Sequence, residues 1–215
     1  MNQEQIEPRQ VAIWTGNVVL GGVLSSPADS AGVAILVSGP GSQARDQRLV
    51  EELNRIRIAT LQVGLLTDDE QQFDSRTGHY RYDADFLAHR LIEVAQWLPK
   101  DVALRGLPIA YVGTTIGAAS ALVAAALRPD IVSVVVAING RTDLAADYLR
   151  TVKTPTLFVL NDMPVLRMNR DALAQIKTEK RIEVIHAEDG QAQEIFVQKA
   201  VRWIADKLAL VAEPV

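Results

Sequence analysis

The chain has 215 residues, of which 48% are hydrophobic and 22% charged, and its formal net charge is -4. This length and apolar content are typical of one globular domain, and no segment reaches the ~18 apolar residues that a membrane-spanning helix needs. The negative charge, without a run of basic residues, argues against a nucleic-acid-binding protein. The sequence contains no cysteine, which excludes disulfides, a cysteine nucleophile and thiolate metal sites.

The location and the partners of the protein are predicted from the same composition. The first ten residues, MNQEQIEPRQ, lack a basic end followed by an apolar run, so we expect a cytoplasmic protein. The three histidines, His79, His89 and His186, are widely separated, which argues against a metal site, and no motif indicates a cofactor. The expected partner is therefore a small-molecule ligand or another protein, including a second copy of the chain in a homodimer, rather than a membrane or a nucleic acid.

The first 30 residues contain two β-rich runs, Val11–Trp14 and Val18–Ser26, which are separated by a Thr-Gly-Asn turn signal. These runs predict an antiparallel hairpin at the edge of a sheet. The other predicted strands are apolar runs without strict alternation, which is typical of strands buried on both faces. They are Val33–Gly39, Ala59–Leu66, Pro108–Thr114, Ile131–Gly140, Thr154–Leu160 and Arg181–Ile185.

Segments with helical spacing of apolar residues lie between these strands. Helices are predicted over Asp83–Leu98, over the alanine-rich stretch after Thr115, and over a C-terminal segment that includes Val197 and Leu208. Strands that alternate with helices predict an α/β fold with a doubly wound, mainly parallel sheet. We expect residues 1–215 to form a single domain that includes the N-terminal hairpin of residues 1–30 and has no large cap domain.

Ligands of doubly wound sheets bind beyond the carboxyl ends of the strands. Six segments follow predicted strands and so belong to that edge: Ser38–Gly41, the loop Thr67–Tyr82, Thr115, Asn139–Gly140, Asn161–Asp162 and His186–Gly190. The loop carries an acidic patch, Asp68 to Glu70, which we interpret as a solvated turn.

The stretch YVGTTIGAAS, residues 111–120, places a hydroxyl between two glycines where a predicted strand meets a predicted helix. Gly113-Thr-Thr-Ile-Gly117 matches the nucleophile-elbow pattern G-x-S-x-G with Thr115 in place of serine. In an elbow the glycines permit a sharp turn, the central hydroxyl projects above the sheet, and the next amide, here that of Ile116, points at a developing oxyanion. A strand, a glycine-flanked turn and a helix also occur in α/β proteins as a plain packing turn, and the spacing alone does not separate these readings.

Three segments, in this order, resemble the α/β-hydrolase superfamily and within it the small dienelactone-hydrolase-like proteins: VSGPGS, GTTIGAASALVAAALRPD and TPTLFVLNDMPVLRMN. The resemblance covers nearly the whole chain from about Ala31. It implies a serine nucleophile at the elbow, an aspartate after a later strand and a histidine beyond the last strand. By position, Thr115 takes the place of the nucleophile and Asp162 that of the acid, whereas the histidine place falls near Gly190.

Two of the three triad positions therefore depart from the family pattern. The extra methyl group of Thr115 is unfavourable at the positive φ that an elbow requires, and without a base a hydroxyl forms no appreciable alkoxide at neutral pH. His186 could supply the base if the loop after the last strand folds back, and His79 could do so from the loop that follows an earlier strand. The alternatives are a strand-end histidine for His186 and a surface or pocket-wall residue for His79.

The oxyanion side departs as well, because the family motif His-Gly-x-Gly reads Ser38-Gly39-Pro40-Gly41 in this sequence. Proline has no N–H, so the second oxyanion donor is lost if it belongs at residue 40 and kept if Gly41 provides it.

Two functions are compatible with these residues. The first is a pseudo-hydrolase that keeps the pocket, binds a small molecule or a partner protein, and has weak or no hydrolytic activity. The alternative is an active ester or lactone hydrolase that uses Thr115, His186 and Asp162. A third idea is that the helix that begins at Ile116 binds a phosphate or a carboxylate through its free amides.

Overall fold

A single eight-stranded sheet in the order β1-β2-β4-β3-β5-β6-β7-β8 runs through the protein. The structure is a computed structural model that describes residues 6–37, 43–161, 163–186 and 189–212. The elements follow in the order β1 (Arg9–Thr15), β2 (Val18–Ser25), β3 (Gly32–Val37), α1 (Gln43–Arg55), β4 (Ile58–Val63), α2 (Asp68–Thr77), α3 (Ala84–Trp97), η1 (Leu98–Lys100), η2 (Val102–Leu104), β5 (Ile109–Thr114), α4 (Ile116–Leu127), β6 (Val134–Ile138), η3 (Thr142–Ala145), η4 (Leu149–Thr151), β7 (Thr156–Leu160), α5 (Met163–Gln175), β8 (Lys180–Val184) and α6 (Asp189–Ala212).

The N-terminal hairpin is antiparallel, as predicted, and the rest of the sheet is parallel. β1 pairs with β2 and β2 pairs with β4 in antiparallel fashion, while the pairs β4–β3, β3–β5, β5–β6, β6–β7 and β7–β8 are parallel. The hairpin turns at Gly16, whose φ of 52° favours glycine. The predicted α/β fold with a mainly parallel sheet is therefore confirmed.

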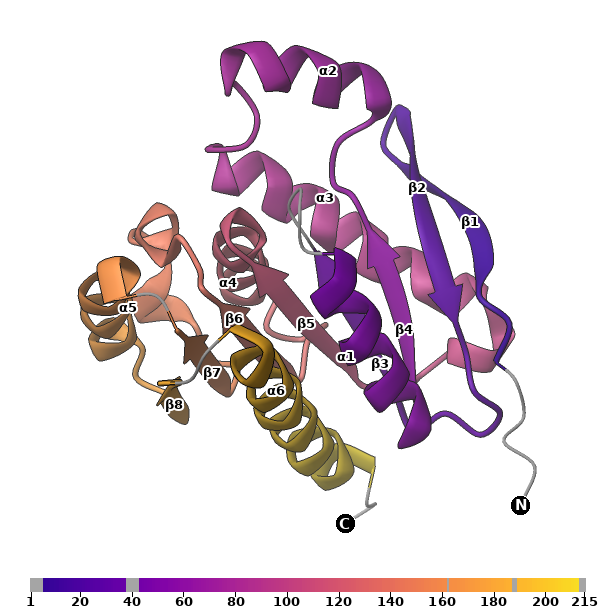
Figure 1. Ribbon diagram of the computed structural model, residues 1–215. Helices are drawn as coiled ribbons and strands as arrows, with labels where there is room; N and C mark the ends of the chain where they lie inside the picture. The colour runs from indigo at the N-terminus through magenta and orange to yellow at the C-terminus, as the bar shows by residue number, and fades with distance from the viewer. Residues whose placement is uncertain (1–5, 38–42, 162, 187–188, 213–215) are drawn as a thin grey trace.

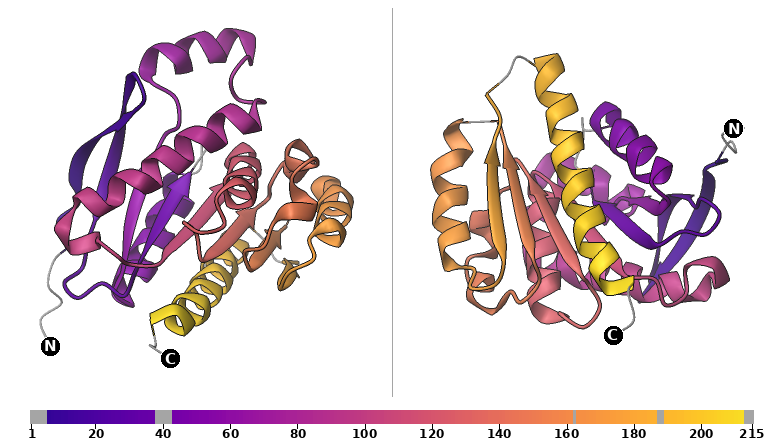
Figure 2. Two further views of the ribbon diagram at one scale, coloured as in Figure 1. Left: turned by 180° about the vertical axis from the view of Figure 1, so that it is seen from behind. Right: turned by 90° about the horizontal axis from the view of Figure 1, so that it is seen from below.

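The period of two along each strand divides the buried side chains between two cores. In β3, Val33 and Ile35 face one core, whereas Ala34 and Leu36 face the other. The first core is closed by α3, α4 and α5, and the second by α1 and α6. Figure 2 shows these helices on opposite sides of the sheet, so the sheet is doubly wound as the sequence predicted.

The chain crosses over between β4 and β5, and this crossover places β3 next to β5 in the middle of the sheet. The helices that follow these two strands, α1 and α4, cover opposite faces. The carboxyl ends of β3 and β5 are therefore the point at which the winding direction reverses, which is the usual ligand position in such sheets. Thr115 lies directly at this point, at the end of β5.

The segment between β4 and α3 differs from its prediction. The sequence predicts a loop over Thr67–Tyr82, but the segment contains the ten-residue helix α2, which lies beyond the carboxyl ends of the strands alongside α3 (Figure 1). The helix begins with a capping box, in which the Thr67 hydroxyl accepts from the Glu70 N–H and the Glu70 carboxylate accepts from the Thr67 N–H. It ends at Gly78 in the left-handed conformation (φ 66°).

Within the ranges that the structure describes, no helix has both the length and the apolar content needed to cross a membrane.

Candidate functional site

Thr115 forms the sharp turn between β5 and α4 and adopts φ 51° and ψ −111°. L-amino acids rarely populate this region, and holding one there costs about 1–3 kcal/mol. The residue is exposed, and its hydroxyl does not cap α4. The backbone therefore presents the Thr115 side chain to solvent at the carboxyl edge of the sheet, in a conformation that the surrounding packing must maintain.

Two glycines make this turn sterically feasible. A Cβ atom on Gly113 would lie 2.3 Å from the Gly117 carbonyl oxygen, and one on Gly117 would lie 2.4 Å from the Val37 carbonyl oxygen. Real Cβ contacts are never this short, so α4 can approach the ends of β5 and β3 only because both residues lack a side chain. The G-x-T-x-G spacing is thus a requirement of backbone packing.

The last residue of β6 and the turn after it form hydrogen bonds with both backbone polar groups of Thr115. The Thr115 N–H donates to the Ile138 carbonyl at 3.0 Å, and the Thr115 carbonyl accepts from the Arg141 N–H at 2.9 Å. Between them, Gly140 packs so tightly against α4 that a Cβ atom there would lie 2.5 Å from the Ala118 Cβ. The strained turn is therefore fixed by backbone hydrogen bonds to a neighbouring strand end.

Ile116, the predicted oxyanion donor, is the first residue of α4 and is half-buried. The first amides of a helix have no acceptor within the helix, and the helix dipole gives them a partial positive charge. The N–H of Ile116 is thus one of the groups at this turn that can donate to a negatively charged oxygen.

His186 is exposed and lies two residues beyond β8, which is three strands from β5. At a strand spacing of ~4.8 Å, the ends of these two strands are roughly 14 Å apart. A hydrogen bond between His186 and the Thr115 hydroxyl therefore requires the chain after Ile185 to fold back over the strand ends. Gly190, the family's histidine position, lies in the first turn of α6.

His79 lies in the connection between α2 and α3 and is also exposed. Its ring packs edge-on against Tyr80 and Phe73, with centroids 4.9 and 6.0 Å apart, and Tyr80 in turn stacks on Phe86. His79 thus belongs to a group of aromatic rings next to α2. His89 lies on the exposed side of α3, with Nδ1 2.9 Å from the Asp85 carbonyl oxygen.

The interpretation of Asp68 to Glu70 as a solvated turn is wrong for Glu70: the three residues form the first turn of α2, in which Asp68 and Asp69 are exposed but Glu70 is half-buried. Glu70 forms a paired contact with Arg90 of α3, whose guanidinium also donates to the Leu65 carbonyl at 2.9 Å. The Arg90 hydrogen bond holds the pKa of Glu70 below its ordinary value, in spite of partial burial. This acidic residue anchors α2 to the body of the protein.

A second ion pair, Asp74–Arg81, lies near the C-terminal end of α2. The Asp74 carboxylate is buried and accepts from the Tyr80 and Arg81 N–H groups and from the Arg81 guanidinium. Burial alone would raise the pKa of Asp74, but these hydrogen bonds outweigh it and the pKa lies below its ordinary value. We refer to residues 67–83 as the α2 excursion.

Sequence reasoning placed Asn139 and Asn161 at the carboxyl edge but did not connect them. The Asn139 side-chain amide donates to the Asn161 Oδ1 at 2.6 Å, and the Asn161 N–H donates to the Asn139 Oδ1 at 3.0 Å. A second link is buried: the Asn169 amide of α5 donates to the Gly140 carbonyl and accepts from the Thr142 hydroxyl. No local pattern indicates either link, because each depends on how separate elements pack.

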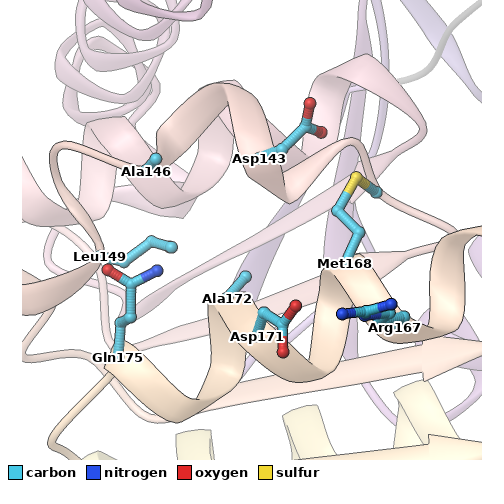
Figure 3. Close-up of a pocket in the computed structure, with 8 residues that line it drawn as sticks. All are labelled: Asp143, Ala146, Leu149, Arg167, Met168, Asp171, Ala172 and Gln175. Carbon is cyan, nitrogen blue, oxygen red and sulfur yellow. The ribbon is translucent and has the colours of Figure 1, made fainter.

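A cavity of about 450 Å³ lies between the η3–η4 segment and α5 (Figure 3). Its lining combines apolar and charged side chains and consists of Asp143, Ala146, Leu149, Arg167, Met168, Asp171, Ala172 and Gln175. Of the predicted site residues that the structure describes, Thr115, Ile116, His79 and His186, none lines it.

Four of the predicted site residues lie outside the described ranges: the acid Asp162 and the oxyanion-side residues Ser38, Gly39 and Gly41. In the part of the chain that the structure does describe, histidine, aspartate and glutamate side chains do not gather in a group of three that could hold a metal ion.

The fold agrees with solved structures. A dienelactone hydrolase from Anabaena variabilis is 37% identical to this chain, with 95% of this chain and 99% of that chain covered and a TM-score of 0.90. Est1E from Butyrivibrio proteoclasticus is 14% identical over 93% of this chain and 99% of its own, with a TM-score of 0.76, which shows a shared fold alone. No family model matches the sequence.

Two Mycobacterium tuberculosis proteins, provisionally named phosphoribosyl transferases, are 32% identical over 213 residues. The match covers 94% of this chain but 47% of each relative, so the chain spans about half the length of these curated relatives.

Proposed function

Because the chain belongs to the dienelactone hydrolase family of the α/β-hydrolase superfamily, we propose that it uses the family's elbow to bind a small molecule or a partner protein and has weak or no hydrolytic activity. The fold gives the chain the architecture of a hydrolase. The residues at the elbow favour weak or no hydrolytic activity.

The observation that carries this proposal is the environment of the Thr115 hydroxyl. The residue has the strained backbone of a nucleophile, but among the described residues no histidine or carboxylate is hydrogen-bonded to its hydroxyl. General-base removal of the proton contributes about 10²–10⁴-fold to such reactions. A threonine without a base is expected to bind a carbonyl compound at the α4 amides without attacking it.

The alternative is an active ester or lactone hydrolase in which Thr115 is the nucleophile, His186 the relocated base and Asp162 the acid. It requires the His186 Nε2 to come within ~3.2 Å of the Thr115 hydroxyl, directly or through one water. Because β5 and β8 are three strands apart, this contact requires the chain after Ile185 to fold back toward Thr115.

The test is hydrolysis of p-nitrophenyl acetate by the wild type and by four variants: Thr115→Ala, Thr115→Ser, Gly190→His, and Thr115→Ser with Gly190→His. We expect the wild type and Thr115→Ala to have the same low rate, because the residue at position 115 does no chemistry. The double variant restores a serine and a histidine at the family positions and should exceed both single variants by about 10²-fold or more. Circular dichroism checks that each variant is folded.

One outcome of the same assay would contradict the proposal. Turnover by the wild type that Thr115→Ala abolishes would overturn the proposal and favour the alternative. His186→Ala would then decide between the candidate bases His186 and His79. Only if His186 is the base should that variant be as inactive as Thr115→Ala.

A further inference from the structure

The end of β6 and the turn that follows it contact both Thr115 and the first turn of α4. Ile138 and Arg141 hydrogen-bond the two backbone groups of Thr115, and the residues between them are Asn139 and Gly140. Gly140 leaves no room for a Cβ atom against α4. Any movement of this turn therefore moves the backbone of Thr115.

The side chain of Asn139 reaches from this turn to the end of another strand. It adopts a positive φ of 44°, which asparagine tolerates better than most residues. Its N–H donates to the Val159 carbonyl of β7, and its side chain forms the two-way bond with Asn161. Asn161 directly precedes Asp162, the acid position that the family resemblance predicts.

We infer that Asn139 is a positioning residue, whose side chain couples the elbow at Thr115 to the end of β7 and so fixes the orientation of the residue-115 side chain. The inference rests on the proposed function, because it concerns the same elbow. Its test does not require hydrolysis, so the two can fail separately.

The physical reason is the strain at Thr115. A residue at φ 51° and ψ −111° relaxes unless its neighbours hold it, and here the holding groups lie on either side of Asn139. The buried Asn169–Thr142 link fixes the Gly140 carbonyl from the α5 side, but nothing in that link reaches β7. Removing the Asn139 side chain should therefore loosen the turn toward β7 and let the elbow relax away from the first amides of α4.

A cysteine at the elbow reports this change directly. The chain contains no cysteine, so Thr115→Cys introduces a single thiol. A thiol at a helix N-terminus has a lowered pKa because the amides stabilise the thiolate. The rate of alkylation by iodoacetamide between pH 5 and pH 10 gives that pKa, and it does so without any substrate.

In the Thr115→Cys background, Asn139→Ala should raise the pKa of the thiol and slow its alkylation at pH 7 by about threefold, which corresponds to half a pH unit. Asn139→Gly should have the same effect, because glycine accepts the positive φ but also lacks the amide. Asn161→Ala should have a smaller effect, since it removes one of the two bonds and leaves the backbone donor of residue 161.

Asn54→Ala is the matched control. Asn54 is a buried asparagine whose amide bonds the Ile58 carbonyl at 2.9 Å and the Thr60 hydroxyl at 3.2 Å, at the start of β4 and away from the elbow. Its loss should lower stability but leave the pH profile of the thiol unchanged. The inference is overturned if Asn139→Gly leaves that profile unchanged, or if Asn54→Ala shifts it as much as the Asn139 variants do.

Discussion

The elbow and the α2 excursion both lie at the carboxyl edge of the sheet, but different forces hold them in place. At the elbow, Gly113 and Gly117 allow backbone to contact backbone, and two main-chain hydrogen bonds fix Thr115. In the α2 excursion, charged side chains make the anchoring contacts, through the pairs Glu70–Arg90 and Asp74–Arg81. The elbow should therefore be sensitive to added atoms and insensitive to pH, and the α2 excursion the reverse.

The largest effect is expected from an added atom at the elbow. In Gly113→Ala, the new Cβ would lie 2.3 Å from the Gly117 carbonyl oxygen, and neither group can rotate away. We expect a loss of about 3 kcal/mol or more in the free energy of unfolding, measured with urea, or a failure to fold. The control is Gly21→Ala in β2, where nothing lies within 4 Å and the change should stay within about 1 kcal/mol. Equal stability of the two variants would contradict the packing argument.

The second effect tests the charges of the α2 excursion. Because the folded-state pKa values of Glu70 and Asp74 are lowered, their contribution is complete above their ordinary values of 4.5 and 3.8 and is lost as the pH falls through the folded values. We expect Glu70→Gln with Asp74→Asn to cost about 2–3 kcal/mol at pH 7 and to flatten the decline in stability as the pH falls below about 4.5.

The control for that comparison is Asp68→Asn with Asp69→Asn, which removes two exposed carboxylates from the same helix. This variant should lose about 0.5 kcal/mol, mainly from the helix dipole, and should keep the decline of the wild type at low pH. If the two double variants have parallel stability curves below about pH 4.5, the ion pairs do not anchor the helix.

The two regions also differ in how far the sequence predicts them. The elbow was visible because a glycine-flanked hydroxyl between a strand and a helix is a local pattern, and the alternation of apolar runs predicted the sheet beneath it. The α2 helix was missed although Thr67 and Glu70 have the spacing of a capping box, because its polar sequence offers no apolar stripe.

The links that fix the elbow could not be predicted by such patterns. Asn139 and Asn161 are 22 residues apart, and their side chains meet only because β6 and β7 are neighbouring parallel strands that end at the same level. The partner of Glu70 was hidden for the same reason, since Arg90 occupies a buried position on a helix whose sequence predicts only an apolar face.

The smallest expected effect distinguishes backbone strain at residue 115 from the ordinary helix propensities of glycine and alanine. At residue 115, alanine at a positive φ is strained, whereas glycine adopts the same φ without strain. Thr115→Gly should therefore be about 1 kcal/mol more stable than Thr115→Ala, despite the greater conformational entropy of glycine in the unfolded chain. At Ser75, an exposed position inside α2, the order should reverse, with Ser75→Ala about 1 kcal/mol more stable than Ser75→Gly. Urea unfolding of the four variants measures both differences. If alanine is the better residue at both positions, the elbow backbone is relaxed in solution, and the surrounding hydrogen bonds do not hold Thr115 in a strained conformation.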